Sequence, residues 1–157
     1  MADIYDLILS VNLPDTLSDA EISELRWHLG LAPQPATPLS LVTDYAEPLI
    51  GDDGRPEEDE QGNWLMSYEP YPVLAAKGPA HHAGGVLLSA LEPETRGGWA
   101  LTSRQEFHPD ELDRVDELLL WLHERAVDSL AFQCHVRFYE EDTFAPVSVT
   151  EGEVNWP

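Results

Sequence analysis

Two adjacent histidines, His81 and His82, stand among glycines and alanines, where imidazole nitrogens could bind a metal ion. A protein zinc site usually takes three or four ligands at recurring spacings such as HExxH or CxxC, and neither spacing occurs in this chain. His108, His135 or acidic residues would have to complete the set. His81, His82 and His108 are therefore the candidate metal ligands. We nevertheless expect residues 78–86 to form a solvated loop and expect no metal or other cofactor.

The neighbouring pair Cys134 and His135 has the residue types of a thiol nucleophile and its base. Both residues fall in the clearest predicted strand, residues 130–142, where successive side chains leave opposite faces of a sheet. The two side chains therefore cannot share a proton, and we expect Cys134 to be a core residue. The chain also lacks GxGxxG, GxxxxGK[ST] and GxSxG patterns. We expect no catalytic residue.

The same strand carries a polar row that could form a binding surface. Its apolar residues share one face, and Gln133, His135, Arg137 and Tyr139 share the other. Neighbouring strands would add further polar residues to that face, namely Asp6, Ser10, Asn12, Thr102 and Arg104. Three interpretations stay open: an ordinary wet sheet face, an interface with a second copy or a partner, and a ligand or catalytic pocket.

In the pocket interpretation, His135 would carry a proton near neutral pH and Arg137 would hold a carboxylate or a phosphate. Tyr139 would complete that pocket, and Gln133 and Arg104 are further candidates for a ligand site or an interface.

The elements that position these residues follow from hydrophobic periodicity and turn signals. Residues 4–13 predict a strand, and Ser18 with Glu21 predicts a capping box at the start of a helix. Further predicted elements are a strand at 39–45, an exposed acidic loop at 51–63, a short edge strand after it, a hairpin within 84–107, a helix at 108–128, the strand at 130–142 and a strand or tail at 145–157.

This order predicts a single α+β domain over residues 1–157. We expect a ferredoxin-like βαββαβ antiparallel sheet with two helices on one face, plus an extra hairpin and the long acidic loop.

Charge constrains the partners of the protein. Thirty acidic residues against eight basic ones give a net charge of −22. Such a surface repels nucleic-acid backbones and anionic lipid, so we expect neither direct nucleic-acid binding nor membrane docking. No apolar run reaches the roughly 20 residues that span a bilayer. The acidic start of the chain is unlike a secretory signal, so we expect a cytoplasmic protein.

The leading hypothesis is a small acidic protein that acts by binding, without catalysis, as a homodimer or with a basic protein partner. One alternative is a ligand-binding protein or enzyme with its pocket on the open sheet face. The other alternative is an inhibitor that mimics DNA.

Overall fold

The computed structural model describes residues 3–75 and 88–157, so His81 and His82 lie outside the described residues. The protein is α+β, with helices α1 (Asp19–His28) and α2 (Leu112–Arg125). The strands are β1 (Tyr5–Leu13), β2 (Glu47–Pro48), β3 (Met66–Ser67), β4 (Leu88–Pro93), β5 (Trp99–Phe107), β6 (Phe132–Phe138), β7 (Ala145–Thr150) and β8 (Glu153–Asn155). Within the described ranges, no helix is long and apolar enough to cross a membrane.

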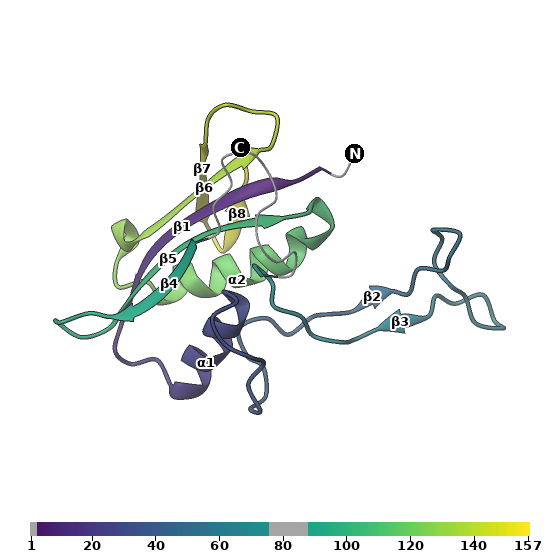
Figure 1. Ribbon diagram of the computed structural model, residues 1–157, viewed down its shortest axis with the longest axis horizontal. Coiled ribbons are helices and arrows are strands. Elements are labelled where there is room, and N and C mark those ends of the chain that lie inside the picture. The colour runs from purple at the N-terminus through teal and green to yellow at the C-terminus, as the bar shows by residue number, and fades with distance from the viewer. Residues whose placement is uncertain (1–2, 76–87) are drawn as a thin grey trace.

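Six of the strands form one antiparallel sheet in the order β4-β5-β1-β6-β7-β8, with β1 between β5 and β6 (Figure 1). The predicted hairpin is present as β4 and β5. The predicted C-terminal strand is present as two short strands, β7 and β8. The two remaining strands, β2 and β3, pair only with each other in a separate two-stranded sheet.

Alternation along β1 and β6 divides the large sheet into an apolar face and a polar face, as the sequence predicts. Leu7, Leu9, Val11 and Leu13 of β1 are each 1% exposed, whereas Ser10 between them is exposed. On β6, Phe132, Cys134 and Val136 are buried in the same way. Apolar residues of both helices, including Leu25 and Leu119, join these side chains in one core cluster. The opposite sheet face carries the polar row.

Helix α1 begins with the predicted capping box. The backbone N–H of Glu21 donates to the Ser18 hydroxyl, and the backbone N–H of Ser18 donates to the Glu21 carboxylate. These two bonds satisfy backbone groups that the first turn of a helix leaves without intrahelical partners. Helix α2 begins after a short 3₁₀ segment, Pro109–Glu111, in which proline occupies the first turn.

The prediction of a strand at residues 39–45 is wrong, because the backbone N–H groups of this segment donate to side-chain carboxylates instead of to a neighbouring strand. Glu24 of α1 is only 1% exposed. Its carboxylate accepts hydrogen bonds from the backbone N–H groups of residues 40–42. The N–H and the hydroxyl of Thr43 both donate to Glu117 of α2. The apolar residues Leu41 and Val42 are buried, which accounts for the strand-like pattern, but they pair with no strand of the described part of the chain.

His28, one helical turn after Glu24, binds a second chain segment, residues 73–75. The ring Nδ1 atom of His28 accepts a hydrogen bond from the backbone N–H of Val73. The backbone carbonyl of His28 accepts from the backbone N–H groups of Leu74 and Ala75. Because Nδ1 is an acceptor, Nε2 carries the proton and points at Glu24, 3.4 Å away. One buried Glu–His pair on α1 therefore fixes both chain segments that flank β2 and β3.

We expect Glu24→Gln to lower the free energy of unfolding by about 2–3 kcal/mol, because hydrogen bonds to a charged group are replaced by weaker ones in a buried site. Urea unfolding followed by circular dichroism measures the change. Glu60→Gln, at an exposed position, is the matched control and should change the value by less than about 0.5 kcal/mol. An equal effect of both substitutions would contradict this role of Glu24.

The same carboxylate predicts a pH dependence of stability. Burial alone would raise the pKa of Glu24, but hydrogen bonds from His28 and from residues 40–42 outweigh it and hold the pKa below its ordinary value of 4.5. The unfolded chain therefore binds this proton at a higher pH than the folded protein does. Stability from this group is complete above pH 4.5 and is lost as pH falls through the folded-state pKa. Urea unfolding at a series of pH values should show a shallower acid loss in Glu24→Gln.

Candidate functional site

The polar face of the sheet carries the residues proposed from the sequence. Gln133, His135 and Arg137 alternate with buried residues along β6, and Tyr139 follows the strand, where its N–H donates to Ile4. Asp6 lies opposite Arg137 in the register, while Ile8 lies opposite both Arg104 and His135. Three neighbouring strands therefore contribute to one surface.

Asp6 joins the two arginines of this surface. One of its carboxylate oxygens, Oδ2, accepts from Arg137 at 2.6 Å and from Arg104 at 3.1 Å. The Asp6 side chain is 7% exposed, and those of Arg137 and Arg104 are 21% and 28% exposed. The Phe144 ring, in the connection after β6, lies 5.0 Å from the Arg137 guanidinium carbon and 5.7 Å from that of Arg104. The ring limits access of water, so these charges attract each other more strongly than an exposed pair would.

Beside this cluster, the structure has a pocket of about 280 Å³. Its lining residues are Ile4, Asp6, Arg137, Tyr139, Glu140, Glu141 and Asp142. The pocket brings together Arg137 and Tyr139 of the proposed site, whereas Gln133, His135 and Arg104 do not line it. The polar row is thus extended over the sheet, and only one end of it borders a cavity.

Sequence reasoning missed two residues of this region. Glu106 lies directly opposite Asp6 on the same face and is 5% exposed. Strand alternation from Arg104 could have placed it there, because residues two apart in a strand share a face. No pattern in the sequence marks Phe144, whose position depends on how the connection between β6 and β7 folds back.

We expect Asp6→Asn to destabilise the protein by about 2–3 kcal/mol, because it leaves two partly buried guanidinium groups without their shared carboxylate. Thermal or urea unfolding measures this. The exposed pair Glu124–Arg125 is the comparison, since Glu124→Gln should cost less than about 0.5 kcal/mol. If Asp6→Asn were as mild as Glu124→Gln, the two arginines would not depend on Asp6.

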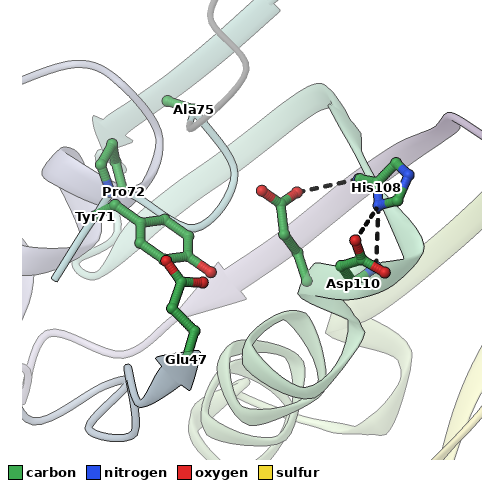
Figure 2. A pocket seen from close by; sticks show the side chains of 7 residues that line it. Glu47, Tyr71, Pro72, Ala75, His108 and Asp110 are labelled. Atoms are coloured by element: carbon green, nitrogen blue, oxygen red, sulfur yellow. Dashed lines mark hydrogen bonds and ion pairs between the residues drawn. The ribbon is translucent and has the colours of Figure 1, made fainter. Parts of the chain in front are cut away.

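A second pocket, of about 400 Å³, contains the described metal candidate, His108 (Figure 2). Nδ1 of His108 accepts from the backbone N–H of Asp110 at 3.2 Å, and the backbone N–H of His108 donates to the Glu111 carboxylate. His108 thus caps the 3₁₀ segment before α2, and this bond occupies Nδ1. Among residues 3–75 and 88–157, no group of three or more His, Cys, Asp or Glu side chains is arranged to hold a metal ion.

Cys134 is buried on the apolar face, and burial raises the pKa of its thiol to about 12. At neutral pH the sulfur is therefore a protonated thiol, which is a poor nucleophile. Its neighbour His135 lies on the opposite face of the sheet, as expected from strand alternation. This pair does not form a nucleophile and base.

The most prominent surface feature is an arm that we define as residues 47–68. It leaves the sheet and helices through β2 and β3 and ends in two small loops (Figure 1). The acidic loop expected at 51–63 is thus the outer part of this arm. Its two turns have the same construction: Gly51 N–H donates to Arg55, and Asp59 N–H donates to Asn63. Gly54 and Gly62 adopt positive φ at equivalent positions of the two turns, as three-residue hairpin loops require.

Three backbone bonds close the arm where its strands meet. The N–H of Leu49 donates to Leu65, that of Leu65 donates to Glu57, and that of Glu57 donates to Leu49, at 2.8–2.9 Å. The three residues therefore form a ring of hydrogen bonds between extended segments. The arm has a defined backbone conformation although it lacks the buried apolar core of the sheet and helices.

Large apolar side chains lie exposed along this arm. Trp64 is 57% exposed and Tyr68 is 70% exposed, and Ile50, Leu49 and Leu65 are exposed as well. Single exposed apolar residues are common, but five of them on one short projecting element are typical of a binding surface. The outer part, residues 51–63, also carries six acidic residues and one basic residue, Arg55.

Comparison with known proteins gives no matching family model, curated protein or solved structure.

Proposed function

We propose that this protein is a non-catalytic binding module whose arm docks onto a partner protein. The observation that carries the proposal is the combination of a closed backbone with exposed side chains. The arm satisfies its own hydrogen bonds at the ring of Leu49, Glu57 and Leu65, yet it leaves Trp64 and Tyr68 in water. An isolated hairpin gains little stability from such side chains in water, whereas burial against a partner would stabilise both.

The charge of the arm supports a basic partner. Acidic side chains at the two turns, among them Asp53 and Glu58, lie on the same arm as the exposed apolar residues, and Glu58 lies opposite Trp64. An interface there would combine apolar contacts with charged ones at the rim. A rim of this sign attracts lysine and arginine side chains and speeds association at low salt. A second copy, also charged −22, would bring like charges together, so we propose a basic protein as the occupant of the arm.

The remaining expectations are consistent with this function. We propose that β6, β1, β5 and β4 with the two helices form a ferredoxin-like core, supported by their order in the sheet and by the shared core cluster. On this interpretation, β7, β8 and the arm are additions to that core. We also propose a cytoplasmic location, supported by a single cysteine that is buried and unpaired.

We expect Trp64→Ala to weaken partner binding about 30-fold, because truncating a central aromatic anchor costs about 2 kcal/mol or more. Affinity capture with the purified protein, followed by identification of the captured proteins and measurement of the affinity of the main one, tests this. The captured protein should be basic, and its binding should weaken as salt is raised.

Leu130→Ala is the matched control, because Leu130 is 83% exposed on the body of the protein rather than on the arm. It should leave the affinity unchanged. Two results would contradict the proposal that the arm binds a basic partner. One is the capture of acidic proteins only, and the other is an equal loss of affinity in Trp64→Ala and Leu130→Ala. Light scattering on the free protein tests whether the arm instead binds a second copy of this chain. A dimer that dissociates in the Trp64→Ala variant would show that it does.

A further inference from the structure

The charged cluster on the polar sheet face contains several buried polar atoms without partners. Among the described residues, the Nε atoms of Arg104 and Arg137 and the Oε1 atom of Glu106 are buried and make no hydrogen bond. Buried polar atoms in folded proteins are rarely left unsatisfied, and such atoms call for a water, an ion or a ligand as partner. Here three of them gather around Asp6.

Register places these groups close together. Glu106 and Asp6 are direct cross-strand neighbours, so their Cβ atoms are about 5 Å apart. Asp6 in turn binds both arginines. Two carboxylates that face each other would repel, and the two guanidinium groups offset that repulsion. The four formal charges sum to zero, and groups of both signs retain unused hydrogen-bonding capacity.

This balance selects the chemistry of a ligand. An anion alone would satisfy the arginines but would face Glu106, and a cation alone would face the arginines. A molecule with separate positive and negative groups meets both requirements. We propose that this surface binds a small zwitterion of the α-amino-acid class, its carboxylate on Arg104 and Arg137 and its ammonium group on Glu106.

The neighbouring pocket of about 280 Å³ meets the cluster at Asp6 and Arg137, which form part of its wall, whereas Arg104 and Glu106 do not line it. The pocket therefore gives room to the side chain of a ligand that contacts the cluster through Arg137. Its rim is acidic through residues 140–142. A second ammonium group on the ligand side chain would therefore gain attraction there, whereas a second carboxylate would be repelled. The site is expected to favour L-lysine over L-glutamate. This site lies on the large sheet, away from the arm, and does not depend on the proposed function.

Titration of the isotope-labelled protein with L-lysine, L-glutamate, acetate and methylammonium, followed by NMR, tests the proposal. The Nε–H signals of Arg104 and Arg137 report directly on the unpartnered atoms. L-lysine should shift both signals, with an affinity at least about tenfold above that of L-glutamate, acetate or methylammonium. Equal responses to acetate and L-lysine would reduce the site to an anion site, and no shift with L-lysine would leave only ordered water there. Either result overturns the proposal.

Two variants and one control separate binding from folding. Arg137→Met should weaken L-lysine binding at least about tenfold. Glu106→Gln keeps the size of the side chain and should weaken L-lysine binding while leaving the response to acetate unchanged. Arg96→Met, at an exposed turn, should bind L-lysine as the unaltered protein does. If a folded Glu106→Gln protein bound L-lysine with unchanged affinity, Glu106 would not bind the ammonium group. The proposal of a zwitterionic ligand would then be wrong.

Discussion

Alternation along β1 is the constraint on which the rest of the structure depends. This strand pairs with β5 on one side and with β6 on the other, so its register determines which residues of three strands face the helices. A shift of one residue would move Leu7 and Leu9 into water and Asp6 into the core. Burial of four leucine and valine side chains of β1 excludes that alternative by several kcal/mol. The polar face follows from the same register, because it is what remains when the apolar residues are buried.

The polar face is more than a wet surface, since its charges are arranged as a group. Asp6 lies at the centre of the sheet and not at its edge, so it can reach an arginine on each neighbouring strand. Phe144 covers the two guanidinium groups and lowers their exposure. Charges in such a place interact strongly, and a polar atom left without a partner there costs more than it would at the rim.

The arm and its flanking segments are stabilised by hydrogen bonds rather than by the burial of apolar strands. The Glu24–His28 pair replaces a strand partner for residues 40–42 and 73–75, which lie on either side of the arm in the sequence. A buried carboxylate accepts several N–H groups at once, so irregular segments can be packed against α1 without a ladder. At the base of the arm, Arg114 of α2 donates to the Ala46 carbonyl and pairs with Glu47. Farther out, the arm relies on its own backbone bonds. The body is thus stabilised by apolar burial, and the arm by hydrogen bonding with its apolar side chains outside.

The sequence by itself determined the elements whose signals are local. The alternation of residues 130–142, the capping box at Ser18 and Glu21 and the turn residues before Trp99 each identify a strand, a helix start or a hairpin, because period and capping depend on near neighbours. It also placed Arg104, Arg137 and Tyr139 on one polar face. Only the tertiary structure showed that residues 39–45 form no strand, since their partners, Glu24 and Glu117, are distant in the sequence. Likewise, the unpartnered Glu106, the position of Phe144 and the projection of the arm depend on long-range packing, which no local pattern encodes.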